Sequence, residues 1–345
     1  MALDRRTRLL GAVLRRATGP VATMPENKRQ ALRAAKAPRV LTGYLNGRLA
    51  AGVSATDHSV PSGSGPLAVR IHRPTGVSGD DLPMVVAFHG GGWMFGNLDT
   101  AQWLWSEVAA RLPAVVVAGT YRLAPEHPAP AALEDAFAIT AWAVEHARDL
   151  GADPDRVAVM GESSGGTLAA SVALRARDSG AFALRCQALI YPITDLTLSS
   201  ASITLMPDQP ILTSADLTAY VKAYLGPDGS PTDPYVSPLL AEDHHGLPPA
   251  LVVSADHDPL RDDARRYAER LAACGVPVEC IELVDSPHGV FSFPNLCHAS
   301  GPGLDALVTD LRRALGVEAP SGWCATTPSV GSLPKTPPTR PGDTT

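Results

Sequence analysis

Cysteine is scarce in this sequence, and its positions follow no metal or disulfide pattern. The five cysteines are scattered, odd in number and form no C-x-x-C pair. Such spacing argues against a zinc ribbon and against a disulfide framework. The motif H-E-x-x-H is also absent, and His244-His245 beside Gly246 reads better as a solvated loop than as half a metal site. We therefore expect no metal site.

Basic charge is also in short supply. Lysine and arginine together number 29 against 35 aspartates and glutamates, which gives a net charge of −6. A protein that binds nucleic acid needs a basic face for the phosphate backbone. We therefore expect no nucleic-acid partner.

The N-terminal region lacks a long hydrophobic run. The apolar stretch from Leu9 to Leu14 ends at Arg15 and Arg16, and a transmembrane helix needs about 20 apolar residues. It is too short for a signal-peptide core, and Arg5-Arg6 resembles a twin-arginine signal only superficially. We expect a cytoplasmic protein without stable membrane insertion. We expect this stretch and its flanking arginines to form a basic amphipathic helix that packs on the protein itself. The alternative is that this helix binds a membrane surface.

The rest of the chain alternates between strand-like and helix-like segments. Apolar residues make up 45% of the 345 residues, enough for one large domain with a sizeable core. Strands are expected at 67–72, 84–88, 114–118, 157–160, 185–190, 250–254 and 278–284, and helices at 131–150, 261–273 and 304–315. This alternation predicts the α/β class, with a mostly parallel central sheet and helices on both faces.

Three segments stand outside this alternation. Residues 1–50 place Leu3, Leu9, Leu10, Val13 and Leu14 among arginines at helical spacing, which predicts an N-terminal helical cap segment. Residues 195–227 hold two helix-like pieces between core strands, which predicts a cap insertion in a catalytic domain spanning 51–316. Residues 317–345 are rich in Pro, Thr, Ser and Gly, and this composition predicts a disordered tail.

The sequence Gly161-Glu162-Ser163-Ser164-Gly165 has the form G-x-S-x-G. It follows an apolar run and precedes a helix-like run, the context that a nucleophile elbow requires. Glycine on both sides leaves room for a strained serine in a sharp turn. Ser163 is the candidate nucleophile, and the simpler alternative is a glycine-rich turn with a serine N-cap.

A nucleophilic serine needs a base and a group that orients the base. His288 is the best base, because it follows the last expected strand and precedes Gly289. The acid should come from the end of the preceding strand, where Asp258 is favoured and Asp256 remains a competitor. The chain order Ser, Asp, His is that of the α/β-hydrolase fold.

An oxyanion hole is expected in His89-Gly90-Gly91-Gly92, which follows an early strand. Backbone N–H groups there stabilise the negative oxygen of a tetrahedral intermediate, each contributing roughly 3–4 kcal/mol. We expect Gly91, Gly92 and Ser164 to supply these donors.

Together these motifs resemble the bacterial hormone-sensitive-lipase family of esterases. The resemblance also includes Tyr121 to Pro128 and Asp258 to Asp262, and runs from about Leu82 to Leu315. It implies an α/β-hydrolase core under a helical cap, a carboxylesterase activity, no metal or organic cofactor, and a possible homodimer through an edge strand. Glu162, Ser164 and Val290 stand where the family usually has Asp, Ala and an aromatic residue.

The expected function is hydrolysis of short-chain carboxylic esters, which are small-molecule substrates, through an acyl-enzyme. The alternatives are an amidase or N-acetyl deacetylase with the same triad, and a non-catalytic binding protein of the same fold. The cap should roof a short apolar acyl pocket. The residues expected to contact substrate are Trp93, Glu162, Ile203, Leu205, Met206, Ile211, Leu212 and Val290.

Overall fold

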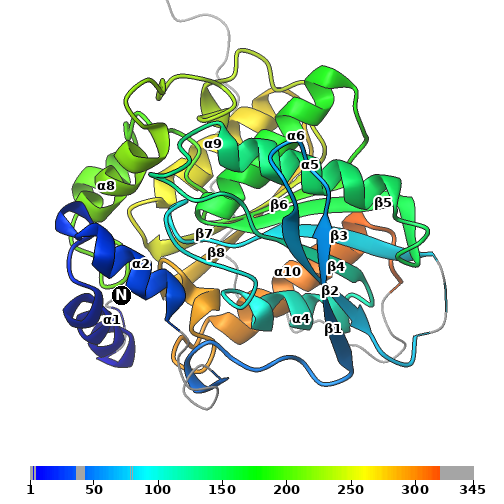
Figure 1. Ribbon diagram of the computed structural model, residues 1–345, viewed down its shortest axis with the longest axis horizontal. Coiled ribbons are helices and arrows are strands. Elements are labelled where there is room, and N and C mark those ends of the chain that lie inside the picture. The colour runs from blue at the N-terminus through cyan, green and yellow to red at the C-terminus, as the bar shows by residue number, and fades with distance from the viewer. Residues whose placement is uncertain (1–2, 4, 36–42, 78, 80, 319–345) are drawn as a thin grey trace, which may run out of the picture.

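The structure is a computed structural model that describes residues 3, 5–35, 43–77, 79 and 81–318. Part of the predicted N-terminal segment, 36–42, and nearly all of the predicted tail, 319–345, lie outside the described residues. The core of the described part is an eight-stranded sheet with helices on both faces (Figure 1).

The sheet is mostly parallel, as the sequence predicted. Its order is β1-β2-β4-β3-β5-β6-β7-β8, and only the pairs β1/β2 and β2/β4 are antiparallel. The strands are β1 (Val53–Val60), β2 (Leu67–Pro74), β3 (Leu82–Phe88), β4 (Val115–Gly119), β5 (Ala152–Glu162), β6 (Cys186–Ile190), β7 (Ala250–His257) and β8 (Val278–Pro287). Because β3 and β5 to β8 run parallel, their carboxyl ends meet at one edge.

Sequence reasoning missed two elements. Strand β1 reads V-S-A-T-D-H-S-V, and only its first and last residues are buried. It lies at the edge of the sheet and is held by pairing with β2 rather than by a buried face. Helix α4 (Gln102–Arg111) was also missed, and it packs its buried residues against the sheet.

The strands divide their side chains between two cores. In β3, Met84, Val86 and Phe88 belong to one hydrophobic core, with α5 (Ala131–Glu145), α6 (Ser164–Ser179) and α9 (Arg261–Ala273). Val85 and Ala87 belong to the other core, with α4 and α10 (Ser300–Ala314). This two-residue alternation places helices above and below the sheet (Figure 1).

A second layer lies over the carboxyl edge of the sheet. It contains α1 (Arg5–Thr18), η1 (Val21–Thr23) and α2 (Glu26–Ala34) from the N-terminus, and α7 (Ala201–Leu205), α8 (Ser214–Leu225) and η2 (Pro238–Leu240) from the segment between β6 and β7. That segment spans 191–249, which is longer than the predicted insertion. The two parts join where the Val21 N–H donates to Asp216 Oδ1 at 2.9 Å, and α1, α2 and α8 lie on one side of the molecule (Figure 1).

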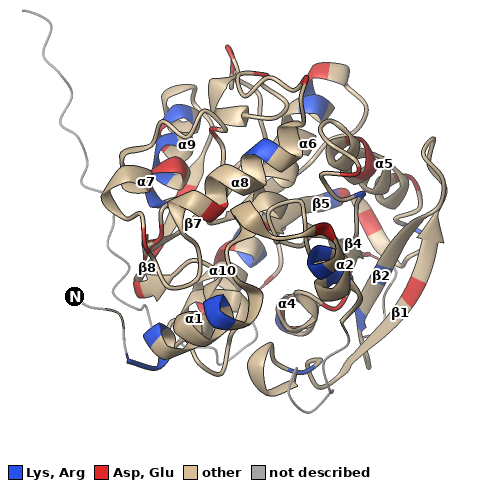
Figure 2. Cartoon of the chain, turned by 60° about the vertical axis from the view of Figure 1, so that its left-hand side comes forward, with Lys and Arg blue, Asp and Glu red and all other residues tan. Residues whose placement is uncertain are grey.

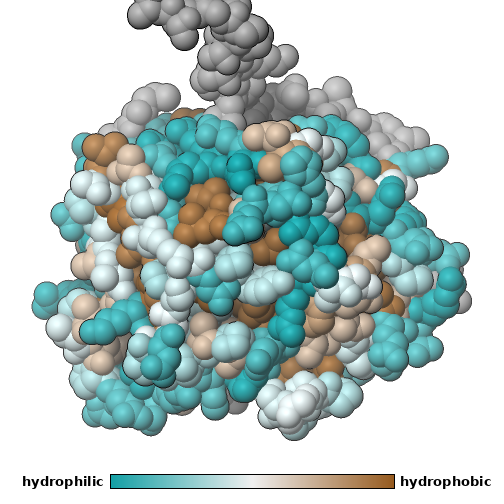
Figure 3. All heavy atoms as spheres, turned by 90° about the horizontal axis from the view of Figure 1, so that it is seen from above, coloured by the Kyte–Doolittle hydropathy of each residue, from teal (hydrophilic) through white to brown (hydrophobic). Residues whose placement is uncertain are grey.

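One face of the molecule is mainly polar. On the face drawn in Figure 3, hydrophilic residues predominate and hydrophobic residues form small separate patches. Among the described residues, none of the helices combines the length and the apolar character that crossing a bilayer requires.

Candidate active site

Ser163 lies in a tight turn between β5 and α6. Its φ is 54°, a left-handed conformation that non-glycine residues rarely adopt. A Cβ on Gly161 would lie 2.1 Å from the carbonyl oxygen of Gly165, and a Cβ on Gly165 would lie 2.2 Å from the carbonyl oxygen of Phe88. The two glycines are therefore required by close backbone contacts on both sides of the serine.

His288 lies between Ser163 and Asp258. Its Nε2 is 2.9 Å from Ser163 Oγ, and its Nδ1 is 2.7 Å from Asp258 Oδ2. Asp258 is fully buried and its second oxygen accepts the Leu260 N–H at 2.9 Å. The three residues come from the ends of β5, β7 and β8, which the parallel sheet brings together.

The competing acid, Asp256, has a different set of contacts. Its two carboxylate oxygens accept the N–H groups of Asp285 at 2.8 Å and Ser286 at 2.9 Å. Asp256 thus fixes the backbone at the end of β8, while Asp258 is the acid that contacts His288.

The glycine loop after β3 passes close to its neighbours. Gly91 has a φ of 122°, and a Cβ there would lie 2.3 Å from the Phe95 carbonyl oxygen. Gly92 has a φ of 60°, and a Cβ there would lie 2.3 Å from the ring of Tyr220. Both positions exclude a side chain, and both glycines line the space in front of Ser163.

The buried His89 side chain packs against this loop. Burial lowers the pKa of His89 to about 4, so the ring is neutral at pH 7. Its Nδ1 is 2.8 Å from the Gly90 carbonyl oxygen, and its ring stacks on Tyr121. The Tyr121 hydroxyl donates to the His89 carbonyl oxygen at 2.8 Å. The segment after β4 thus braces the glycine loop.

A cavity of about 280 Å³ opens above Ser163. Of the predicted contact residues, Trp93, Glu162, Ile211 and Leu212 line it, as do Gly91, Gly92 and Ser164 of the predicted oxyanion hole. The further lining residues that sequence reasoning missed are Asn46, Gly90, Thr100, Tyr191, Ile193, Leu217, Tyr220, Leu260, Gly289, Ser292 and Phe293.

Four predicted contact residues lie outside this lining. Leu205 is 72% exposed at the end of α7, and Met206 follows it in a partly exposed position. Ile203 is buried in the core between the insertion and the sheet. Val290 is fully buried on the other side of the sheet, in the core with α4 and α10. These four side chains therefore do not line the cavity above Ser163.

Some of the missed residues left a signal in the sequence. Tyr191 directly follows the predicted strand of β6, so it had to lie at the carboxyl edge beside the serine. Leu217 and Tyr220 are three residues apart in a predicted helical piece, so they share a face. Asn46 and Phe293 left none, because only the packing of distant segments brings them to the cavity.

A buried carboxyl group lies beside the nucleophile. Burial raises the pKa of Glu162, although the Tyr191 hydroxyl donates to its Oε2 at 3.0 Å. The Tyr191 ring meets the His288 ring edge-on, with centroids 4.8 Å apart. Glu162 therefore holds Tyr191, and Tyr191 packs against the base.

Helix α2 is held by hydrogen bonds and ion pairs to the end of the glycine loop and to the segment after β4. Arg33 donates to the carbonyl oxygens of Met94 at 2.7 Å and Ala124 at 2.5 Å. Arg29 and Arg33 each reach one oxygen of Glu126 at 3.0 Å. Burial opposes ionisation of Glu126, but the hydrogen bonds it accepts, including those from the two arginines, lower its pKa to about 2.

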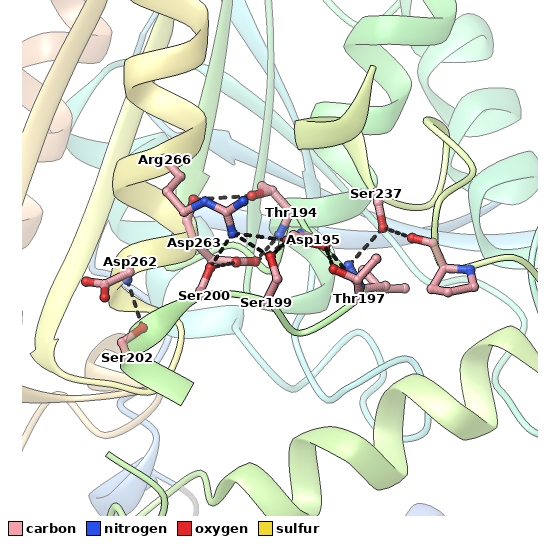
Figure 4. Close-up of polar contacts among 12 residues, drawn as sticks. Thr194, Asp195, Thr197, Ser199, Ser200, Ser202, Ser237, Asp262, Asp263 and Arg266 are labelled. Carbon is pink, nitrogen blue, oxygen red and sulfur yellow. Dashed lines mark hydrogen bonds and ion pairs between the residues drawn. The ribbon is translucent and has the colours of Figure 1, made fainter. Parts of the chain in front are cut away.

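A polar cluster ties the start of the insertion to α9 (Figure 4). The buried Asp263 accepts the N–H groups of Thr194 at 2.6 Å and Asp195 at 3.0 Å, together with the Ser200 hydroxyl. The buried Asp195 in turn accepts from Arg266 at 3.0 Å. Burial raises the pKa of Asp263 to about 6.

Hydrogen bonds also join the insertion to the loop that carries Asp258. The Ser202 hydroxyl donates to the Pro259 carbonyl oxygen at 2.6 Å and accepts the Asp262 N–H at 3.1 Å. The loop that carries Asp258 and the first turn of α9 are therefore both hydrogen-bonded to the insertion through Ser202, and Figure 4 shows the contact between Ser202 and Asp262.

Within the described residues, two groups have ligand atoms close enough to surround a metal ion. They are Asp243, His245 and Cys274, and Asp256, His257 and Asp285. Asp243 binds the His245 ring at 2.6 Å, and both oxygens of Asp256 hold backbone N–H groups. These contacts account for the carboxylates of Asp243 and Asp256 without an ion. His244 is buried, with Nε2 2.9 Å from the Pro238 carbonyl oxygen, rather than in the predicted solvated loop.

Comparisons with known proteins identify the family of this chain. A family model described as alpha/beta hydrolase fold matches residues 85–292. Carboxylic ester hydrolase LipN of Mycobacterium tuberculosis is 42% identical over 269 residues, covering 76% of this chain and 71% of that protein. Carboxylesterase NlhH of the same organism is 43% identical over 249 residues, covering 70% of this chain and 77% of that protein.

Solved esterase structures superpose over nearly the whole chain. A thermostable esterase from Pseudomonas putida gives a TM-score of 0.82 at 31% identity and covers 92% of this chain and 99% of that one. An esterase from Pyrobaculum calidifontis gives 0.81 at 31% identity and covers 92% and 100%. From the family match, the sequence identity and the shared fold, the chain belongs to the hormone-sensitive-lipase-like family of serine carboxylesterases with the α/β-hydrolase fold.

Proposed function

We propose that this protein hydrolyses short-chain carboxylic esters with Ser163 as nucleophile, His288 as base and Asp258 as orienting acid. The observation that carries the proposal is the hydrogen-bonded line from Ser163 Oγ through both ring nitrogens of His288 to Asp258. Nucleophile, base and orienter within hydrogen-bond reach define an activated serine.

The first half of the reaction forms an acyl-enzyme. Ser163 Oγ attacks the ester carbonyl carbon while its proton passes to His288 Nε2. The carbonyl oxygen becomes negative, and backbone N–H groups of Gly91, Gly92 and Ser164 stabilise it. The intermediate collapses, the bond to the alcohol breaks, and His288 returns the proton to the leaving alkoxide.

The second half releases the acid. A water molecule gives a proton to His288 Nε2 and attacks the acyl carbon. The second tetrahedral intermediate uses the same oxyanion donors, and its collapse restores Ser163. Asp258 keeps the proton of the neutral ring on Nδ1 and stabilises the imidazolium that forms in both halves.

The size and lining of the cavity support small ester substrates. Pockets for drug-sized ligands are about 300–1,000 Å³, and this cavity, at about 280 Å³, falls just below them. Ile211, Leu212 and Leu217 provide an apolar wall from the second layer. We propose that residues 1–50 and 195–227 form the cap and that the acyl pocket takes about two to six carbons. A homodimer through the exposed edge of β8 is a further proposal.

A chain-length series tests the substrate class. p-Nitrophenyl esters from acetate to laurate are compared with p-nitroacetanilide, with purified Ser163→Ala as the background. We expect the highest kcat/KM among acyl chains of two to six carbons. A preference for the anilide would favour the amidase alternative. The absence of Ser163-dependent turnover on every substrate would favour the non-catalytic alternative.

A further inference from the structure

The outward face of α1 carries apolar and basic side chains together. Leu9 and Val13 lie one turn apart and are 66% and 56% exposed. Arg5 lies one turn before Leu9, and Arg16 lies about one turn after Val13, so all four follow one side of the helix. Arg5 and Arg16 are exposed as well.

The charge of α1 is opposite to that of the molecule. The helix contains five arginines and no acidic residue, whereas the whole chain has a net charge of −6. Figure 2 shows basic residues and no acidic ones along α1. The nearest acid in the sequence is Asp4, directly before the helix.

The opposite face of α1 holds the helix on the protein. Leu10 and Gly11 are buried, and a Cβ on Gly11 would lie 2.4 Å from Pro210. Arg15 Nη1 donates to the Gln209 carbonyl oxygen at 3.0 Å. The helix therefore presents its Leu9–Val13 side outward in a fixed position.

We propose that the outward face of α1 binds the surface of an anionic lipid bilayer. Arg5 and Arg16 would meet the lipid phosphates, and Leu9 and Val13 would enter the boundary between headgroups and acyl chains. Apolar side chains that enter this boundary and basic side chains that meet anionic lipid both contribute to binding at a bilayer surface. This binding is peripheral and reversible.

Charge complementarity selects lipid over the chain's own terminal segment. Residues 319–345 contain Lys335 and Arg340 against the single acid Asp343, so they offer no negative surface to five arginines. An anionic bilayer offers many phosphates at once, together with an apolar boundary for Leu9 and Val13. A second copy of this chain is the remaining occupant, and the test below distinguishes it.

Binding at α1 would bring the cavity near the lipid. The loop that α1 packs on continues into Ile211 and Leu212, which line the cavity. A helix is about 10 Å across, so a bilayer on the outward face would lie about one helix diameter from this loop. Esters that partition into membranes would then be concentrated beside the site.

Vesicle flotation of the full chain tests the proposal. Phosphatidylcholine vesicles are compared with vesicles in which about a third of the lipid is phosphatidylglycerol. We expect binding to the anionic vesicles that weakens as salt is raised. Arg5→Gln with Arg16→Gln should weaken the partition about 30-fold, from about 1 kcal/mol per basic residue, and Leu9→Ser with Val13→Ser about ten-fold. The matched control replaces an exposed valine and arginine elsewhere, Val77→Ser with Arg148→Gln.

Fold and site are monitored separately in every variant. Thermal melting and turnover of p-nitrophenyl acetate in free solution should be unchanged, because the four side chains are exposed. The proposal is overturned if wild-type protein ignores anionic vesicles, or if the Leu9/Val13 variant and the control float equally. It is also overturned if the native mass by light scattering falls in the α1 variants, because a second copy would then be the occupant.

Discussion

The floor and the roof of the cavity are built by different means. The floor comprises residues 88–93, 161–166, 256–260 and 286–290 at the carboxyl edge of the sheet. The roof comprises the part of the segment between β6 and β7 that lines the cavity through Ile211, Leu212, Leu217 and Tyr220, and we propose that α1, η1 and α2 extend it. In the floor, backbone lies against backbone, as where a Cβ on Gly161 would lie 2.1 Å from the Gly165 oxygen. In the roof, side chains make the fit, as where Trp93 of the floor stacks on Tyr224 of α8 at 4.1 Å.

This difference predicts two kinds of mutational effect. A change in the floor removes a reacting group or a donor, so it should lower kcat whatever the substrate. A change in a roof side chain that lines the cavity alters its shape and wetting, so the effect should depend on the substrate. Variants in the two parts test this division.

The strongest test is removal of the nucleophile. Ser163→Ala should lower kcat on the order of 10⁶-fold, because only binding and the oxyanion donors remain. The matched control is the next residue, Ser164→Ala, which keeps its backbone N–H and should stay within about ten-fold of wild type. Steady-state hydrolysis of p-nitrophenyl butyrate measures both. Comparable losses in the two variants would mean that the turn, rather than the Ser163 hydroxyl, is what matters.

The two neighbouring acids give the next largest effect. Asp258→Asn should lower kcat on the order of 10⁴-fold, because an amide cannot hold His288 in the required tautomer. Asp256→Asn should cost far less, since Asp256 accepts backbone N–H groups at the end of β8 whereas Asp258 contacts His288. Parallel kcat measurements on the two variants check the order. The reverse ranking would move the orienting role to Asp256.

The sequence predicted the floor because its chemistry restricts the residues at fixed places. A glycine is needed where a side chain has no room, and a serine, an aspartate and a histidine must each follow a parallel strand. These requirements are local, and the strand pattern supplies the rest. Ser163, Asp258 and His288 could therefore be chosen before any packing was known.

The roof could not be predicted in the same way. Ile203 and Leu205 are both apolar and lie in the same short helix, yet Ile203 is 7% exposed and Leu205 72%. Which of them turns inward depends on how α7 packs against α9, and no local pattern encodes that. Strand β1 was missed for a related reason, since pairing with β2 rather than burial defines it.

Tyr220 tests whether the roof controls specificity. Its ring covers Gly92 and lines the cavity, so Tyr220→Ala should open the acyl pocket. We expect kcat/KM for octanoate relative to acetate esters to rise roughly ten-fold, while Tyr220→Phe keeps the wild-type ratio. Tyr235→Ala is the control, because this tyrosine lies in the same insertion and binds Asp178 outside the cavity. An equal loss of kcat/KM on esters of every chain length would instead mean that Tyr220 supports the glycine loop rather than shaping the acyl pocket.

The smallest expected effect is on the pH dependence of stability, through Asp263 in the polar cluster between the insertion and α9. An aspartate has a pKa of 3.8 before folding, and burial raises the pKa of Asp263 to about 6 in the folded protein. Between these values the folded protein binds more protons than the unfolded chain, so this group makes stability fall as pH rises from about 4 to 6. The size should be on the order of 1–3 kcal/mol.

Asp263→Asn should remove this part of the slope, because the amide does not titrate and its oxygen can still accept the two backbone N–H groups of Thr194 and Asp195. Urea unfolding of both proteins between pH 4 and 7 measures the difference in slope. Asp310→Asn is the control on α10, since the pKa of Asp310 is also raised by burial but its ion pair is with Arg313, far from the insertion in sequence. Parallel curves for wild type and Asp263→Asn would show that folding leaves the pKa of Asp263 unchanged, because the hydrogen bonds from Thr194, Asp195 and Ser200 offset its burial.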